Sequence, residues 1–200
     1  VGSEMCIRDR FKGLDRVYNN FVYDFLYPNP ASVLAFIENH DTDRFLGEGD
    51  NLPMLKQAST LLLTTRRIPQ LYYGTEIMMN GVKSKSDGYV RKDFPGGWTG
   101  DTETALTAAG RSKIQNECYN FYKTLLNWRK GNDVIAKGSM VQFMVQNGVY
   151  AYARQHEGKT VFVMLNGTDA ETTVPLKFYK EILKDSKQGK DILSGKSVAF

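Results

Sequence analysis

Three features are scarce in this sequence of 200 residues: long apolar runs, clustered charge of one sign, and cysteine. No run of about 18 apolar residues is present, so the sequence predicts no membrane-spanning helix. The net charge of +4 is spread along the chain without a basic stripe, which gives no indication of a nucleic-acid partner. Of the two cysteines, Cys118 lies on an apolar helical face, where we expect an inert core thiol.

The composition is that of a globular protein. Hydrophobic residues make up 42% of the chain and aromatic residues 12%, which is enough to fill a core, and 200 residues allow one or two domains. Residues 1–10 show neither helical nor strand periodicity, so we interpret them as adapter-like, non-native sequence and exclude them from the fold. The lack of a signal peptide therefore indicates nothing about the compartment.

The first half of the chain alternates helical and strand patterns. Apolar residues recur every three or four positions over residues 14–25, which predicts an amphipathic helix that ends before Pro28. The apolar run over residues 33–37 predicts a buried strand. A capped helical pattern over residues 50–62 and a second strand signal within residues 67–76 follow. This order of strand, helix and strand predicts a βα unit with parallel strands.

The pattern changes after the helix predicted over residues 114–125, which ends near Gly131. Apolar and polar residues then alternate, and Asn147-Gly148 and Glu157-Gly158 are hairpin signals. Antiparallel strands are predicted at residues 140–145, 149–153, 161–165, 172–174, 182–183 and 192–193. We place a domain boundary near residues 131–134, which gives one domain over residues 11–132 and a β-rich domain over residues 133–200.

A dense set of ionisable side chains follows the strand predicted over residues 33–37. Asn39, His40 and Asp41 come directly after it, and parallel strands of α/β enzymes deliver active-site residues at this end. Arg44 is a candidate cation that keeps the Asp41 carboxylate ionised, and Glu38 is a candidate for orienting the loop. The alternative is a solvated loop after a core strand.

The Asn39-His40-Asp41 segment resembles the last catalytic signature of the alpha-amylase family (glycoside hydrolase family 13), at the end of the seventh barrel strand. Residues 67–76, with the sequence R-I-P-Q-L-Y-Y-G-T-E, resemble the eighth-strand signature of that family. Arg67 stands where the family usually has glycine. If that glycine allows a close backbone approach, the Arg67 side chain must point outward.

A third segment narrows the resemblance. Residues 87–98, D-G-Y-V-R-K-D-F-P-G-G-W, resemble a loop of cyclomaltodextrinase-like and neopullulanase-like members. Trp98 offers a flat apolar face for a sugar ring, and Arg91 and Asp93 offer directed polar contacts. The alternative is a structural loop whose aromatic side chains cover the end of a barrel.

The resemblance implies an α/β fold class: the C-terminal part of a (β/α)8 TIM barrel over residues 11–132, followed by an all-β sandwich over residues 133–200 that is possibly truncated. A barrel alone takes roughly 250 residues. We therefore expect only the last part of a barrel, with the nucleophile and general acid of the family upstream of Phe11. The chain alone is then expected to be inactive.

The function that the resemblance implies is part of a retaining glycoside hydrolase cleaving alpha-glucosidic bonds in starch-derived glucans or cyclomaltodextrins. Asp41 is assigned as the transition-state stabiliser. The candidate substrate-binding residues are His40, Asn39, Arg44, Arg91, Asp93 and Trp98. The alternative is a non-catalytic, amylase-like carbohydrate-binding or transporter-associated protein. Transfer of the sugar to another sugar, in place of water, is a variant of the favoured function.

No cofactor is required by this interpretation. Calcium is possible, but the acidic pairs Asp87 with Asp93 and Glu48 with Asp50 match no calcium-loop spacing, so no metal site is assigned. The expected partner is an alpha-glucan or cyclodextrin substrate, with no nucleic acid and no membrane, and the oligomeric state is open. The resemblance gives bacterial periplasm or cytoplasm as compartments, without deciding between them.

Overall fold

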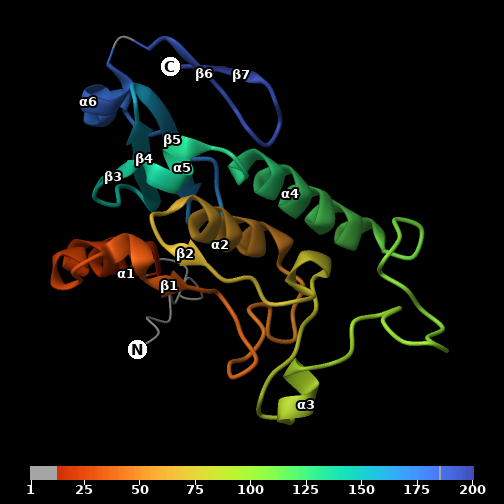
Figure 1. Cartoon of the computed structure of the whole chain (residues 1–200). Helices are drawn as coiled ribbons and strands as arrows, with labels where there is room; N and C mark the ends of the chain where they lie inside the picture. The colour runs from red at the N-terminus through yellow and green to blue at the C-terminus, as the bar shows by residue number, and fades with distance from the viewer. Residues whose placement is uncertain (1–12, 185) are drawn as a thin grey trace. The chain divides into compact units, whose positions relative to one another are not determined.

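A computed structural model describes residues 13–184 and 186–200, so the segment interpreted as adapter-like lies outside the described residues (Figure 1). The elements follow in the order α1 (Gly13–Val22), η1 (Tyr23–Leu26), η2 (Pro30–Ser32), β1 (Leu34–Ala35), α2 (Leu52–Thr64), β2 (Ile68–Pro69), η3 (Thr75–Ile77), α3 (Asp87–Val90), α4 (Lys113–Arg129), α5 (Asp133–Lys137), β3 (Ser139–Gln142), β4 (Val149–His156), β5 (Lys159–Asn166), η4 (Leu176–Tyr179), α6 (Lys180–Leu183), β6 (Gln188–Lys190) and β7 (Ser197–Ala199).

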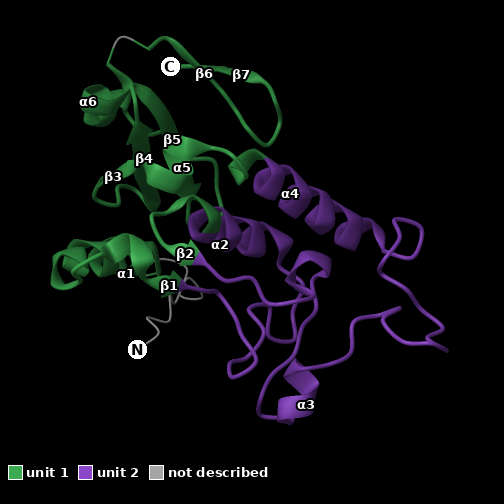
Figure 2. Cartoon of the chain, in the orientation of Figure 1, with its two compact units in different colours: residues 1–34, 63–68, 128–200 green, residues 35–62, 69–127 purple. Residues whose placement is uncertain are grey.

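The chain divides into two compact units, coloured green and purple in Figure 2. Unit 1 takes residues up to 34, residues 63–68 and residues 128–200. Unit 2 takes residues 35–62 and 69–127. The sheet of β3, β4 and β5 and the sheet of β6 and β7 fall in unit 1. The loops that carry the predicted site residues fall in unit 2.

Two short strands, β1 and β2, pair with each other on either side of α2 in the sequence. The backbone N–H of Ile68 donates to the Val33 carbonyl at 3.0 Å, and that of Gln70 donates to the Ala35 carbonyl at 2.8 Å, so the strands run parallel. The predicted order of strand, helix and strand is confirmed, although the first strand is shorter than predicted. These two parallel strands are consistent with part of a barrel, and the barrel itself stays an expectation.

Helix α2 begins where its capping signal predicts. The side-chain oxygen of Asn51 accepts a hydrogen bond from the Met54 backbone N–H at 3.0 Å, which satisfies one of the donors left free at a helix start. Within unit 2, α2 packs against α4 through buried Ser59 and Tyr122, whose hydroxyls are hydrogen-bonded. Among the described helices, none is both long and apolar enough to cross a membrane.

Cys118 occupies the buried face of α4, as predicted for a core thiol. Its side chain is fully buried, and burial raises the pKa of the thiol to about 12. A thiol that stays protonated is a poor nucleophile, so the geometry agrees with a structural role for this cysteine.

In unit 1, β3, β4 and β5 form an antiparallel sheet in that order, with Val149 opposite Asn166 and His156 opposite Lys159. Asn147 and Gly148 have φ values of 51° and 76°, and Glu157 and Gly158 have φ values of 47° and 74°. Positive φ at both central residues is the geometry of the two-residue hairpin turn that matches the twist of the strands. The hairpin prediction between β4 and β5 is confirmed.

Strand β4 is buried on both of its faces from Val149 to Arg154. Because side chains alternate along a strand, Tyr150 and Tyr152 share one face, and Ala151 points to the other. On the first face, the Tyr150 ring meets the Tyr18 ring edge-on at 6.5 Å between centroids. On the second face, Ala151 belongs to a core cluster with Tyr179 and Leu183.

Three predicted strands in the C-terminal region are wrong. Residues 172–174 form no strand, residues 182–183 lie in α6, and residues 192–193 lie in the turn between β6 and β7. A short apolar pair fits a strand and one turn of helix equally well, and tertiary packing decides between them. Here Ile182 and Leu183 are both buried, and Leu183 packs with Tyr179 and Ala151 on the second face of the sheet.

The expectation that Arg67 points outward is also wrong. Its guanidinium is buried in unit 1, where it pairs with the Asp24 carboxylate and donates to the Pro30 carbonyl at 2.9 Å. The Arg67 guanidinium also stacks over the Phe21 and Tyr27 rings, with its carbon 5.3 and 5.5 Å from their centroids. A buried arginine is tolerated here because a carboxylate and aromatic faces surround it.

Candidate functional site

The loop after β1 is stabilised by hydrogen bonds between its own backbone and side chains. The Asn39 backbone N–H donates to the Thr42 hydroxyl at 3.1 Å, and the Asp41 backbone N–H donates to the Asn39 side-chain oxygen at 2.8 Å. Asparagine favours this kind of turn because its side chain accepts from the backbone two residues on. Asn39 therefore shapes the loop, and the His40 and Asp41 side chains are left 58% and 63% exposed.

Three of the residues predicted from the sequence meet at this loop. The His40 Nε2 atom lies 3.2 Å from Asp41 Oδ2, and the Arg91 guanidinium lies 3.3 Å from Asp41 Oδ1. Arg91 also donates from Nε to the His40 carbonyl at 3.0 Å. An exposed carboxylate is thus flanked by an imidazole and a guanidinium, all of them within reach of a ligand from solvent.

Two further charges surround Arg91. Its guanidinium lies 3.1 Å from Asp87 Oδ2, and Lys83 reaches the other Asp87 oxygen at 3.2 Å and the Asp41 carbonyl at 3.1 Å. The hydrogen bond from Lys83 lowers the pKa of the Asp87 carboxyl, and the charge of Arg91 adds to this effect. Sequence reasoning missed Lys83, although its spacing of four residues before Asp87 was a usable signal.

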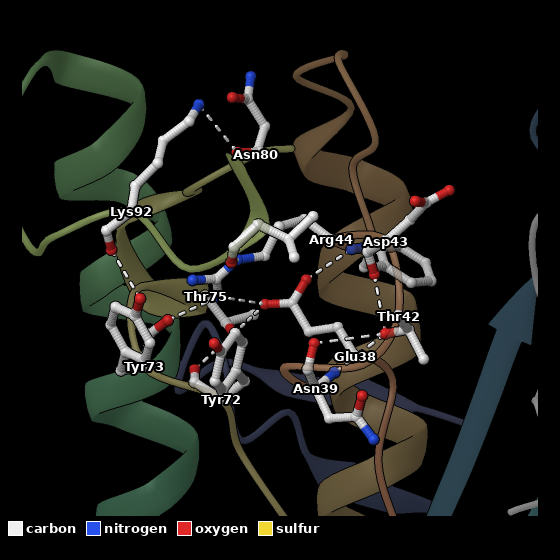
Figure 3. Close-up of polar contacts among 12 residues, drawn as sticks. Glu38, Asn39, Thr42, Asp43, Arg44, Tyr72, Tyr73, Thr75, Asn80 and Lys92 are labelled. Carbon is white, nitrogen blue, oxygen red and sulfur yellow. Dashed lines mark hydrogen bonds and ion pairs between the residues drawn. The ribbon is translucent and has the colours of Figure 1, made fainter. Parts of the chain in front are cut away.

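Arg44 is not the cation at Asp41, and this expectation is corrected by the structure. Its side chain is 1% exposed and pairs with Glu38, with 3.2 Å between Nη1 and Oε1 (Figure 3). The guanidinium donates from Nε to the Val90 carbonyl at 2.9 Å and from Nη1 to the Tyr73 carbonyl at 2.7 Å. Arg91 takes the place beside Asp41 that the sequence suggested for Arg44.

Glu38 joins the loop after β1 to the segment after β2. One carboxylate oxygen accepts from the Thr75 hydroxyl, and the other accepts from the Phe45 backbone N–H at 2.5 Å (Figure 3). The Arg44 guanidinium carbon lies 4.0 Å from the centroid of the Tyr72 ring and 4.8 Å from that of Tyr73. The sequence suggested Glu38 as an orienting residue but gave no indication of the roles of Tyr72 and Thr75.

Asp93 and Trp98 are not brought to this cluster. Within the described part of the chain, no hydrogen bond, ion pair or ring contact joins either residue to His40 or Asp41. The Trp98 side chain is 67% exposed, and its backbone N–H donates to Asp101 Oδ2 at 3.1 Å. Their predicted contacts with substrate stay predictions.

The cluster places one carboxylate between two side chains that can donate hydrogen bonds. The Asp41 carboxylate can accept hydrogen bonds from a hydroxyl-bearing ligand, while His40 and Arg91 can donate to ligand oxygens. Over residues 13–184 and 186–200, no group of three or more histidine, cysteine, aspartate or glutamate side chains is arranged to hold a metal ion.

Comparisons with known proteins agree with these motifs. Residues 140–200 match the family model described as the cyclo-malto-dextrinase C-terminal domain. An alpha-amylase of Niallia circulans is 31% identical over 199 residues, covering 96% of this chain and 34% of that protein. A cyclomaltodextrin glucanotransferase of Thermoanaerobacterium thermosulfurigenes is 31% identical over 192 residues, covering 92% of this chain and 24% of that protein.

Among solved structures, the chain is similar to CldA, described as a cyclomaltodextrin glucanotransferase with a three-domain ABC distribution. The TM-score is 0.59 and the identity 28%, over 80% of this chain and 30% of that one. The chain therefore spans about a third or less of the length of these three relatives. The family model at residues 140–200 and the relatives that match more than nine-tenths of the chain place it in the alpha-amylase family, glycoside hydrolase family 13.

Proposed function

We propose that this chain contributes the transition-state-stabilising carboxylate of a retaining glycosidase acting on alpha-linked glucans or cyclomaltodextrins. The observation that carries the proposal is the Asp41 carboxylate, exposed to a ligand and flanked by His40 and Arg91. The curated relatives named alpha-amylase and cyclomaltodextrin glucanotransferase support hydrolysis and transfer as the reaction types.

In this proposal Asp41 stabilises positive charge at the anomeric centre. The transition state of glycoside cleavage resembles an oxocarbenium ion, so a fixed carboxylate near the sugar ring stabilises it more than the ground state. The carboxylate must be ionised and held still for this effect to be large. Arg91 and the backbone turn at Asn39 supply that order here, since they hold the Asp41 side chain and main chain respectively.

His40 and Arg91 bind the substrate in this proposal. His40 lies beside Asp41 with an exposed ring and can donate a hydrogen bond to a sugar hydroxyl. Arg91 presents a planar guanidinium with five N–H donors, which is 40% exposed at the same place. Asp93 and Trp98 are proposed as outer contacts of a longer glucan, by resemblance of their loop to cyclomaltodextrinase-like and neopullulanase-like members.

The retaining reaction also needs a nucleophile and a general acid, two carboxyl groups about 5 to 5.5 Å apart. We propose that both lie outside this sequence, because the chain covers 34% or less of its curated relatives. The 200-residue chain by itself is then expected to give no turnover of maltooligosaccharides, cyclodextrin or pullulan.

The test is the kinetics of Asp41→Asn in the complete polypeptide encoded by the gene. Loss of the charge should lower kcat and kcat/KM together, by a factor on the order of 10² or more, because the interaction acts chiefly in the transition state. His40→Ala should act more on KM, since it removes a hydrogen bond to bound sugar. Glu48→Gln, an exposed acid paired with Lys85, serves as the control and should behave like the parent.

Two results would contradict the proposal. Parental kinetics of a folded Asp41→Asn protein would remove Asp41 from the mechanism. A parent protein that binds maltoheptaose in calorimetry but cleaves none of the alpha-glucans would favour the alternative of a non-catalytic carbohydrate-binding protein.

A further inference from the structure

The buried pair of Glu38 and Arg44 is the least expected feature near the candidate site. The two side chains are 2% and 1% exposed, so both charges have lost nearly all contact with water. Burial of a charge is unfavourable unless hydrogen bonds and an opposite charge compensate for it. A pair of this kind therefore needs a structural reason, and its neighbours along the chain indicate one.

Each member of the pair lies next to a residue of the cluster. Glu38 directly precedes Asn39, which starts the turn that carries His40 and Asp41. Arg44 donates to the carbonyl of Val90, the residue directly before Arg91, at 2.9 Å. The pair thus holds the backbone on both sides of the contact between Asp41 and Arg91.

The Glu38–Arg44 pair is also held by a third segment of the chain. Thr75 donates to Glu38, the Tyr73 carbonyl accepts from Arg44 at 2.7 Å, and the Tyr72 ring lies under the guanidinium (Figure 3). These three residues belong to the segment after β2. Segments that are far apart in the sequence and largely without regular secondary structure therefore meet at one ion pair.

Hydrogen bonds suit this task better than apolar contacts because they are directional. Apolar contacts are non-directional, whereas the donor and acceptor geometry of a hydrogen bond fixes both angle and distance. Asp41 and Arg91 lie on exposed loops, and ordered loops need such a fixed point beneath them.

We propose that the Glu38–Arg44 pair is the positioning element of the candidate site, setting the alignment of Asp41 with Arg91. Neither residue touches the substrate in this proposal, and both act through the loops that they hold. The inference rests on the proposed function of Asp41, and it adds which buried residues place that carboxylate.

The test is a double-mutant cycle between Glu38 and Arg91 in the complete polypeptide. Glu38→Gln keeps the volume but removes the charge, and we expect kcat/KM to fall about tenfold, mainly through kcat. Arg91→Ala removes the partner of Asp41 and should lower kcat/KM by about 10². If Glu38 acts through Arg91, the double variant should be no worse than Arg91→Ala, because the alignment is already lost.

A merely structural role would give a different pattern. The two losses would then multiply to about 10³ in the double variant, and this outcome would overturn the proposal. Asp24→Asn is the matched control, since Asp24 is also a buried carboxylate, is paired with Arg66 and Arg67, and belongs to unit 1, whereas the cluster belongs to unit 2. It should lower the melting temperature and leave kcat/KM at the parental value.

A second variant and a structural measurement allow the positioning role to be tested separately from the proposed function. If Glu38→Gln does not fold, Thr75→Val removes one hydrogen bond to Glu38 at constant volume and takes its place in the cycle. If the parent shows no turnover, the proposed function fails, and crystal structures of the parent and of Glu38→Gln decide the positioning role. Arg91 displaced from Asp41 in the variant would support it, and an unchanged contact would refute it.

Discussion

Arg44 in unit 2 and Arg154 in unit 1 are both buried arginines, and they are stabilised in different ways. In unit 2, Arg44 faces the Glu38 carboxylate and the rings of Tyr72 and Tyr73. In unit 1, Arg154 is 2% exposed, and its guanidinium donates to four backbone carbonyls. These carbonyls belong to Thr64 at 2.9 Å, Ile135 at 3.0 Å, Gly138 at 2.7 Å and Ser139 at 3.2 Å.

Three of the carbonyls around Arg154 belong to the C-terminal parts of helices, and the fourth, of Ser139, belongs to the start of β3. Thr64 is the last residue of α2, and Ile135 lies in the short helix α5. Helix C-termini carry carbonyls without intrahelical partners and a partial negative charge, so one guanidinium can satisfy several of them. Burial nevertheless lowers the pKa of Arg154 to about 10. Arg44 is thus balanced by a carboxylate where loops meet, whereas Arg154 is balanced by backbone carbonyls where helices and a strand meet.

The largest effect on stability is expected from Glu38→Ala. It leaves the Arg44 charge buried without its anion, which costs about 3 to 5 kcal/mol of unfolding free energy. Urea unfolding of the complete polypeptide measures this loss. Glu48→Ala, at an exposed pair with Lys85, should change stability by less than about 1 kcal/mol. Equal losses in the two variants would show that burial of the pair is unimportant.

Arg154→Met should have the next largest effect, about 2 to 3 kcal/mol, because buried carbonyls lose a charged donor but no opposite charge is stranded. Arg154→Lys keeps the charge with fewer donors and should lose less. If Arg154→Met proved as stable as the parent, the carbonyls would have found other donors, and the contrast with Arg44 would disappear.

The alkaline pH dependence of stability should depend on the buried thiol of unit 2. The Cys118 pKa is raised from 9.0 to about 12, so between these values the unfolded chain loses a proton that the native state keeps, and stability falls as pH rises. The free energy of unfolding, measured from about pH 8 to 11, should therefore decline less steeply in Cys118→Ala than in the parent. Parallel curves for the two proteins would contradict the assignment.

The smallest change in stability is expected from Arg91→Gln. Its ion pairs with Asp41 and Asp87 are 40% or more exposed, and pairs of this kind contribute about 0 to 1 kcal/mol. Thermal unfolding should thus be close to parental, whereas activity should fall. A large loss of stability would mean that Arg91 holds the loops together itself, as Glu38 and Arg44 do.

Local features were the ones that the sequence predicted well. The hairpin turn at Glu157-Gly158 and the start of α2 at Asn51 depend on residues within a few positions of each other. Their conformations follow from backbone preferences and short-range hydrogen bonds, which a sequence states directly. The same holds for the turn at Asn39 that exposes His40 and Asp41.

Contacts between residues that are far apart in the sequence could not be predicted from it. Arg44 and Arg91 both lie in polar loops, and only the fold shows that Arg91, 50 positions from Asp41, is its neighbour. Arg67 was expected to point outward because it stands where the family usually has glycine, yet its side chain is buried and pairs with Asp24, 43 positions earlier. Periodicity likewise gave the wrong element for Ile182 and Leu183, since packing on Tyr179 selected the helix.

The double burial of β4 has a consequence for how this unit can vary in evolution. A strand with one solvent-exposed face accepts substitutions at every second position. Strand β4 has no solvent-exposed position from Val149 to Arg154. Ala151 is small because the Tyr179 ring occupies the space across from it. Volume at these two positions is therefore shared, and we expect a larger residue at 151 to persist only beside a smaller one at 179.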